Sequence, residues 1–200
     1  MSVLEQFRFL DPGPLIDREL ELVIPEERWI DGLLHTLQHP LTRQLAPQDA
    51  ELTREQLTRF VRDYPLGRQG ALPEKGIVPA YHFWMRLRPE YRPHVQIAGG
   101  IGLRIGHGPN LEMYLGQVGY IVHPPARGRR YAERAVRLLL PLAKRSGLNP
   151  LWITCSPDNI ASRLSCERAG GKWVETVVLP ADHGLYAKGE RLKCRYRFDL

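Results

Sequence analysis

The sequence predicts a mixed α/β fold, and three observations lead to that prediction. Apolar segments with strand character alternate with segments whose apolar residues recur at helical spacing. An apolar strand at residues 112–123 leads into a helix and then into a short, wholly apolar strand at 151–155, which favours parallel pairing. The hydrophobic content of 43% and the charged content of 25% are those of a globular protein. We therefore expect one domain over residues 1–200, with its own core.

The first third of the chain predicts one strand and two helices. Residues 19–24 (ELELVI) read as a strand that Pro25 ends, and residues 26–38 follow as a helix with one apolar face. The sequence from Thr53 to Gln56 has the capping-box pattern and begins a second helix that extends to about residue 63. The many glycine and proline residues between 62 and 77 predict a loop.

The rest of the chain predicts a sheet interrupted by two helices. Glycine and proline clusters separate its segments, and Gly147 suits a helix C-terminus. Pro141 falls inside the first of these helices, where it removes one hydrogen bond. The predicted strands are 80–87, 94–105, 112–123, 151–155, 172–179 and 191–200, and the predicted helices are 130–145 and 159–169.

The positive charge of the chain is concentrated in one segment. Residues 127–145 hold seven basic residues and one acid, which accounts for the whole net charge of +6. Such a cluster indicates a phosphate-bearing ligand or nucleic acid, although a solvated helix face has the same composition. Interleaved aromatic residues, a zinc pattern and a helix-turn-helix match are missing, which argues against nucleic acid.

Other classes of protein are disfavoured by composition. No apolar stretch approaches the roughly 20 residues of a membrane helix, and the N-terminus lacks the apolar core of a signal peptide. We therefore expect a cytoplasmic protein without a membrane partner. Cys155, Cys166 and Cys194 are odd in number and far apart, which argues against a disulfide framework, and no metal-ligand spacing is found.

The segment 117–132 (QVGYIVHPPARGRRYA) carries the functional argument. An apolar strand ends at two prolines, and a basic, glycine-containing turn then leads directly into a helix. The first backbone N–H groups of a helix lack intrahelical partners, so this end binds phosphate. Gly128 allows a close approach of the backbone, and Arg127, Arg129 and Arg130 add positive charge there.

On these residues the sequence resembles the GNAT acyltransferases. Their pattern is a strand, Val-x-Pro-x-x-Arg/Gln-x-x-Gly-x-Gly/Ala, and a helix; Val122, Pro124, Arg127 and Ala132 match it, whereas Arg130 replaces its middle glycine. The segments 153–163 (ITCSPDNIASR) and 167–171 (ERAGG) resemble the family's strand–Asn–helix–Glu-Lys-x-Gly segment. The resemblance, closest to a subgroup of bacterial acetyltransferases, covers most of the chain and is strongest from 99 to 171.

The resemblance implies a fold and an activity. The fold is a central, mostly antiparallel mixed sheet with two splayed parallel strands and flanking helices. The activity is transfer of an acetyl group from acetyl-coenzyme A to an amine of a small molecule or peptide, by direct attack on the thioester and without a metal. A homodimer stays open. The implied cofactor-binding residues are Tyr120, Ile121, Val122, Arg127, Gly128, Arg129, Arg130, Tyr131, Ala132, Asn159 and Ser162.

The catalytic residues that the family implies are replaced in this chain. The position of its usual glutamate base is Gly116, so Glu112 and Tyr114, on one face of a predicted strand, are the candidate replacements, with packing and a solvated strand start as the alternatives. The position of its general-acid tyrosine is Cys166, which otherwise packs as a small residue. These replacements motivate a rival hypothesis, a catalytically silent protein of the same fold that binds acyl-coenzyme A as a sensor or interaction module.

Overall fold

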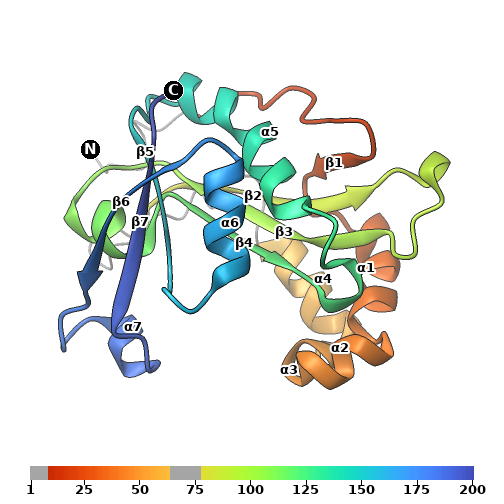
Figure 1. The fold of residues 1–200 in the computed structure, drawn as a ribbon. Coiled ribbons are helices and arrows are strands. Elements are labelled where there is room, and N and C mark those ends of the chain that lie inside the picture. Colours follow the sequence, from red (N-terminus) through yellow and green to blue (C-terminus); the bar gives the residue numbers. More distant parts are fainter. Residues whose placement is uncertain (1–8, 64–77) are drawn as a thin grey trace.

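The computed structural model describes residues 9–63 and 78–200 and contains two antiparallel sheets. The strands of each sheet stand side by side in Figure 1. The first sheet has the order β1 (Leu20–Val23), β2 (Ala80–Leu87), β3 (Ile97–Arg104) and β4 (Val118–Val122). The second has the order β5 (Leu151–Cys155), β7 (Leu192–Phe198) and β6 (Lys172–Val178).

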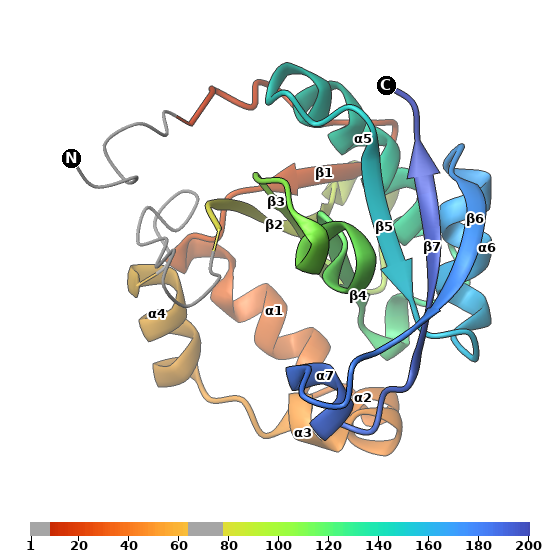
Figure 2. The ribbon, with the colours of Figure 1, turned by 90° about the vertical axis from the view of Figure 1, so that its left-hand side faces the viewer.

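Helices cover both faces of the first sheet. One face packs against α5 (Tyr131–Arg145), and α6 (Ile160–Arg168) lies beside the second sheet (Figures 1 and 2). The opposite face carries the N-terminal helices, and a single-turn helix lies in the hairpin between β6 and β7 (Figure 2). These shorter helices are α1 (Ile30–Leu37), α2 (Pro40–Leu45), α3 (Pro47–Ala50), α4 (Arg54–Asp63) and α7 (Gly184–Ala187).

The period-two pattern of the strands divides their side chains between two cores. On β2, Tyr81, Phe83 and Met85 belong to the core beneath α5, whereas Trp84 packs with the apolar residues of α1 and α4. The core beneath α5 also contains residues of β5 and β7, so both sheets share it. Leu139 of α5 is fully buried there, and burial of such a side chain stabilises the fold by about 1.5–3 kcal/mol.

The strands β4 and β5 touch only where they begin. The backbone N–H of Gln117 donates to the carbonyl of Trp152 at 2.7 Å, and the Trp152 N–H donates to the Gln117 side-chain oxygen at 2.6 Å. Beyond this point the described strands form no ladder with one another. The predicted parallel pairing is therefore corrected to a single contact followed by a splay, as the family resemblance implied. The splay leaves a gap between the two sheets.

The strand predicted at 112–123 begins six residues later than expected. Residues Leu111–Leu115 form one wide helical turn, closed by a hydrogen bond of 2.7 Å from the Gly116 N–H to the Leu111 carbonyl. Gly116 then adopts a φ of 70°, which reverses the chain into β4. The apolar residues of this segment mimicked a strand pattern because a single helical turn is too short to show its own period.

The other predictions were largely confirmed. The capping box is reciprocal: the Gln56 side chain accepts from the Thr53 N–H at 2.8 Å, and the Thr53 hydroxyl accepts from the Gln56 N–H at 3.2 Å. The helix with Pro141 is continuous from Tyr131 to Arg145. The short helices α2, α3 and α7 were missed, because four to six residues show no clear periodicity. Most of the predicted loop at 62–77 lies outside the described residues.

The helices formed by the described residues all lack the combination of length and apolar character that crossing a lipid bilayer requires.

Candidate active site

The turn before α5 exposes a row of backbone N–H groups. Gly128 and Arg130 both have positive φ, 80° and 58°, which turns the chain sharply into the helix. Within the described part of the chain, the backbone N–H groups from Gly128 to Ala132 have no hydrogen-bond acceptor. They border a cleft of about 450 Å³ between β4 and α6. Such a helix N-terminus binds anions, because its free N–H groups and its dipole both face outward.

The eleven residues predicted to bind the cofactor all border this cleft. They come from the end of β4, from the turn before α5 and from the start of α6. The Asn159 side chain caps α6 by accepting from the Ser162 N–H at 3.0 Å. The residues brought together are Tyr120, Ile121, Val122, Arg127, Gly128, Arg129, Arg130, Tyr131, Ala132, Asn159 and Ser162.

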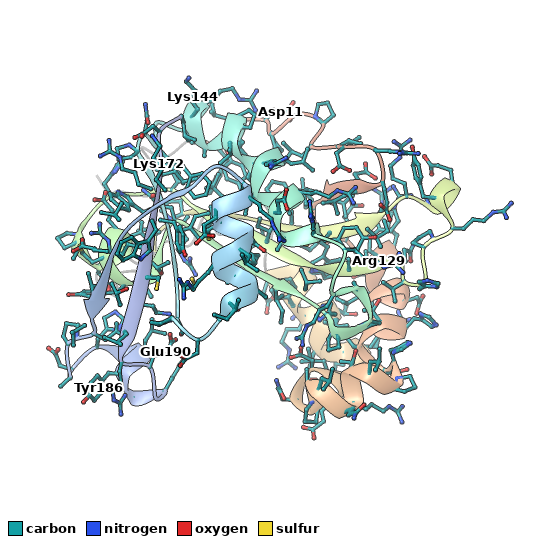
Figure 3. All side chains as sticks on the ribbon, in the orientation of Figure 1. Asp11, Arg129, Lys144, Lys172, Tyr186 and Glu190 are labelled. Atoms are coloured by element: carbon teal, nitrogen blue, oxygen red, sulfur yellow. The ribbon has the colours of Figure 1, made fainter. Side chains whose placement is uncertain are left out.

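The basic cluster of the sequence divides into two groups. Arg129 and Arg130 border the cleft, and Arg127 donates to the Val122 carbonyl at 3.0 Å beside it. Other members stabilise the fold: Arg134 is paired with Asp17 and Glu19, Arg137 with Glu133, and Arg145 with backbone carbonyls. Figure 3 shows Arg129 and Lys144 at opposite ends of α5. Only the N-terminal end of the helix therefore offers its charge to the cleft.

The Arg134 guanidinium fastens this helix to β1. It donates to both Asp17 carboxylate oxygens at 2.6 Å and to Glu19 at 3.1 Å. Burial raises the pKa of Asp17, but hydrogen bonds from Arg134 and two backbone N–H groups outweigh it and lower the pKa overall. Hydrogen bonds from Tyr131, 2.6 Å away, and from Arg134 lower the pKa of Glu19.

Tyr120 of β4 stands where three cavities meet. It borders the cleft at α5, a cavity of about 270 Å³ in the splay, and an apolar cavity of about 620 Å³ on the other face of the sheet. Its hydroxyl lies 2.8 Å from the Ser162 hydroxyl and 3.6 Å from the Cys166 sulfur. Burial raises the pKa of Tyr120, so the phenol stays protonated.

The structure gathers the three cysteines, which the sequence separates, beneath α6. Cys155 and Cys194 are directly opposite partners on β5 and β7, and Cys166 lies on the helix above. All three are buried free thiols. A hydrogen bond from Cys166 lowers the pKa of Cys155, and the same bond raises the pKa of Cys166, so Cys155 is the more acidic thiol. Of the three, Cys155 alone borders a described cavity, the one in the splay.

The cavity in the splay is polar. Glu190 accepts from the Ser156 hydroxyl at 2.9 Å and pairs with Lys193 (Figure 3 labels Glu190). Burial raises the pKa of Glu190, but hydrogen bonds from Lys193 and Ser156 outweigh it and lower the pKa overall. The Arg104 guanidinium also borders this cavity, donates to the Gly116 carbonyl at 3.0 Å, and has its pKa lowered by burial.

The apolar cavity lies between the sheet and the N-terminal helices. Its wall is formed by aliphatic and aromatic side chains of α1, α4 and β2, and Phe60 stacks on Trp84 with ring centres 6.3 Å apart. Glycines of β3 and β4 form its floor. His123 borders it and has its pKa lowered by burial, although its Nδ1 lies 3.7 Å from an Asp49 carboxylate oxygen. His82 also borders it.

The register of the first sheet aligns His82 with two glycines on the strands between it and the splay. His82, Gly102 and Gly119 are successive partners across β2, β3 and β4. A Cβ atom placed on Gly102 would lie 3.4 Å from the His82 Nδ1 atom, so the imidazole rests on the bare backbone of β3. Gly119 also borders the splay cavity. The Arg104 guanidinium lies over Gly119, because a Cβ atom placed there would be 3.4 Å from its Nη1 atom.

The residues predicted for catalysis have different surroundings. Glu112 and Tyr114 lie on the helical turn before β4, so the predicted common strand face does not exist. The Glu112 carboxylate is 3.1 Å from His107, the Tyr114 ring is 5.1 Å from the ring of His183, and neither residue borders a described cavity. Cys166 is fully buried within reach of Tyr120. Their catalytic roles stay predictions.

Sequence reasoning missed three polar residues of the site, namely His82, Arg104 and Glu190. The polar residue at 82 in a mostly apolar strand and the glycines at 99, 100 and 102 were signals that could have indicated a cavity over the sheet. Among the described residues, no group of three or more histidine, cysteine or acidic side chains is arranged to hold a metal.

Most of the chain matches a family model. Residues 20–172 match the model of the acetyltransferase (GNAT) domain. No curated protein sequence matches the chain significantly.

Several solved structures share the fold at low sequence identity. The microcin self-immunity acetyltransferase MccE in complex with acetyl-coenzyme A and AMP is 16% identical over 92% of this chain and 94% of that chain, with a TM-score of 0.63. An acetyltransferase of the GNAT family from Bacillus anthracis is 17% identical over 93% and 98%, with a TM-score of 0.61. The ribosomal α-N-protein acetyltransferase RimL, whose bound coenzyme A forms a disulfide with a cysteine of that protein, is 16% identical over 94% and 98%, with a TM-score of 0.61.

Proposed function

Because this chain belongs to the GNAT acetyltransferase family, we propose that it transfers an acetyl group from acetyl-coenzyme A to an amine that enters through the apolar cavity. The observation that carries the proposal is the row of unpaired backbone N–H groups at the start of α5. It faces the same cleft as Tyr120, where the cavities on the two faces of the sheet meet. Acetyl-coenzyme A would thus reach Tyr120 through the cleft, and the amine would reach it through the apolar cavity.

The residues of the cleft suit coenzyme A. The N–H groups from Gly128 to Ala132 and the charges of Arg129 and Arg130 would hold the pyrophosphate. The exposed edge of β4 beside the splay would offer its backbone groups to the pantetheine arm. The cosubstrate supplies the activated acetyl thioester. In this plan the backbone does most of the binding, which explains why few side chains are needed.

The apolar cavity would help the acceptor to react. An amine attacks a thioester only in its neutral form, and a lysine-like ammonium costs about 4–5 kcal/mol to deprotonate at pH 7. Burial disfavours the charged form, so a cavity walled by residues such as Leu57, Phe60 and Trp84 lowers the pKa of a bound amine. The apolar wall therefore favours the neutral amine and reduces the free energy that a base must supply to deprotonate it.

His82 is the side chain best placed to take the remaining proton. Its imidazole rests over Gly102, on the side of the sheet from which the amine would arrive. Glu190 borders the splay as well, but hydrogen bonds from Lys193 and Ser156 lower its pKa and weaken it as a base. We therefore propose His82 in the role that Glu112 and Tyr114 were predicted to have.

The Tyr120 hydroxyl is the proposed donor to the departing thiolate. It lies 3.6 Å from the sulfur of Cys166, the position at which the family resemblance implies a tyrosine. The Tyr120 hydroxyl from β4 thus lies near the place where the family resemblance implies a tyrosine hydroxyl from α6. A thiolate with a pKa near 8.5 leaves with little assistance, so a hydrogen bond is sufficient.

The first experiment is calorimetric titration with acetyl-coenzyme A. We expect micromolar binding, about −8 kcal/mol, in the wild type. The variant Arg129→Ala/Arg130→Ala should bind roughly ten- to a hundredfold more weakly, and less so at high salt. Lys144→Ala/Lys172→Ala removes the same charge from exposed positions outside the cleft and should bind normally.

The outcome separates this proposal from its rivals. No binding at millimolar cosubstrate in the wild type contradicts the proposed function. Equal weakening in both double variants indicates a general effect of net charge and removes the cleft as the binding site. Binding without thiol release from any amine supports the catalytically silent alternative. The His82→Gln variant then tests the base: it should bind acetyl-coenzyme A normally but lose the acid limb of the pH–rate profile.

A further inference from the structure

The Arg104 side chain is partly buried beside the splay, and among the described residues no carboxylate pairs with it. It lies on the face of β3 that carries Gly102 and reaches over β4, where a Cβ on Gly119 would lie 3.4 Å from its Nη1 atom. Among the described residues its side chain donates one hydrogen bond, to the Gly116 carbonyl, and forms no ion pair. A guanidinium has five N–H donors. Most of them therefore lack an acceptor in the described part of the chain.

The charge balance of the cavity favours an anion beside Arg104. The other charged groups that border it, Glu190 and Lys193, pair with each other and cancel. Arg104 then leaves the cavity with one net positive charge. A buried charge is costly unless a partner and hydrogen bonds compensate it. Arginine also has the planar donor geometry that binds a carboxylate through two parallel hydrogen bonds.

The position of this charge relates it to the acceptor. The cavity that Arg104 borders and the apolar cavity share Gly119 and Tyr120, and Tyr120 also borders the cleft at the start of α5. A molecule whose amine lies at this junction can direct a carboxylate to Arg104 and an apolar group between Trp84 and Leu57. A molecule that carries both the carboxylate and the apolar group on the carbon next to its amine can place all three groups in this way.

We propose that the acceptor is an apolar α-amino acid or a close analogue, an amine whose adjacent carboxylate is bound by Arg104. This inference rests on the proposed acetyl transfer and specifies its substrate class. It distinguishes the chain from an enzyme that acts on protein N-termini, because an N-terminal residue has an amide where the amino acid has a carboxylate. In the reaction the amine nitrogen forms the amide bond to the acetyl carbon and gives its proton to the base. The thioester bond breaks, and coenzyme A leaves as its thiolate.

The test compares acceptors that differ only in the carboxylate. Thiol release is measured with phenylalanine, phenylalanine amide and phenethylamine, and with leucine, methionine and tryptophan as further amino acids. We expect kcat/KM for phenylalanine to exceed that for its amide and for the amine about a hundredfold, as for a site whose polar group loses its partner. In Arg104→Gln this ratio should fall to near one, while Arg104→Lys retains part of it.

Each other outcome overturns the proposal. The amide or the amine reacting as well as phenylalanine excludes carboxylate recognition, and so does the absence of turnover with all four amino acids by a protein that binds acetyl-coenzyme A. An equal loss for every acceptor in Arg104→Gln shows that the guanidinium acts on the thioester instead. Calorimetry with acetyl-coenzyme A on each variant separates these results from a failure of the proposed function. If Arg104→Gln does not fold, the same acceptors are compared on the wild type and on Arg104→Lys. That comparison still tests whether the carboxylate is recognised.

Discussion

The hydroxyl of Tyr120 lies 2.8 Å from the hydroxyl of Ser162 and so joins β4 to α6 across the gap between the two sheets. Both residues border the cleft at the start of α5 and the cavity in the splay, so the bond closes the wall that these two cavities share. The same hydroxyl is the proposed hydrogen-bond donor to the departing thiolate. One oxygen atom therefore both links β4 to α6 and has the proposed role in the reaction.

Tyr120→Phe should reduce kcat about tenfold and destabilise the protein by about 1 kcal/mol, because it removes one buried hydroxyl but keeps the ring. Tyr196→Phe is the matched control: it also removes a buried hydroxyl, bonded to Glu167 at 3.1 Å, but at a residue that borders no described cavity. Steady-state kinetics and urea unfolding of both variants check the prediction. Equal kcat values for both would remove Tyr120 from the chemistry.

Arg130→Gly should stabilise the fold while weakening cofactor binding. Arg130 has a φ of 58°, which glycine adopts without strain, so unfolding should cost about 0.5–1 kcal/mol more in the variant. Arg129→Gly removes the same charge from a residue without positive φ and should destabilise instead. Thermal melts and calorimetry separate the two effects. A lower melting temperature for Arg130→Gly contradicts the strain argument.

Arg134→Met should destabilise the protein at pH 7 by roughly 1–2 kcal/mol, because it leaves Asp17 and Glu19 without their partner. Both carboxyl pKa values are lowered in the folded state, so their contribution is present above the unfolded values near 4 and is lost as pH falls through the folded values. The difference from the wild type should therefore shrink between pH 7 and pH 3. Urea midpoints measure it.

The control for this pH dependence is Arg197→Met. Arg197 pairs with Asp199 at 2.8 Å, but both side chains are about half exposed, so the pair contributes little. Its midpoint should differ from the wild type by a small, nearly constant amount at both pH values. A gap between Arg134→Met and the wild type that stays constant from pH 7 to pH 3 would contradict the linkage.

Gly100→Leu should raise KM for the acceptor at least tenfold and leave acetyl-coenzyme A binding unchanged. A Cβ on Gly100 meets only the Phe83 carbonyl at 3.5 Å and the Trp84 ring at 3.9 Å, so the backbone tolerates a side chain that then fills the apolar cavity. Gly100→Ala is the graded control, with a smaller effect. Acceptor kinetics and calorimetry test it, and unchanged acceptor KM in Gly100→Leu would place the acceptor elsewhere.

Cys155 should be the first thiol to react with a maleimide, and acetyl-coenzyme A should slow the reaction. Cys155 borders the splay cavity and a hydrogen bond from Cys166 lowers its pKa, whereas Cys194 is buried against Thr176 at 3.5 Å. Peptide mass spectrometry after brief labelling identifies the site. Cys155→Ala should abolish the fast phase and Cys194→Ser should retain it; protection that is absent in the wild type removes Cys155 from the cofactor path.

Local sequence was sufficient to predict that the turn before α5 ends in free N–H groups, which is the proposed phosphate-binding end of the site. The residues from Tyr120 to Ala132 are nearly contiguous, and the free N–H groups of a helix N-terminus follow from the hydrogen-bond pattern of any helix. The bounds of β2 and β5 were predicted to the residue for the same reason, since their patterning is local. The error at Glu112 and Tyr114 arose where a single turn was too short to show its period.

The arrangement of the proposed acceptor side was decided by the tertiary structure alone. His82 and Arg104 lie on separate strands, and each becomes part of the site because the partner strand offers a glycine, Gly102 or Gly119, for the side chain to cross. Likewise Cys155 and Cys194 meet only through the register of β5 with β7. Register depends on the packing of the whole sheet, and the sequence around any one of these residues carries no record of the neighbour it will face.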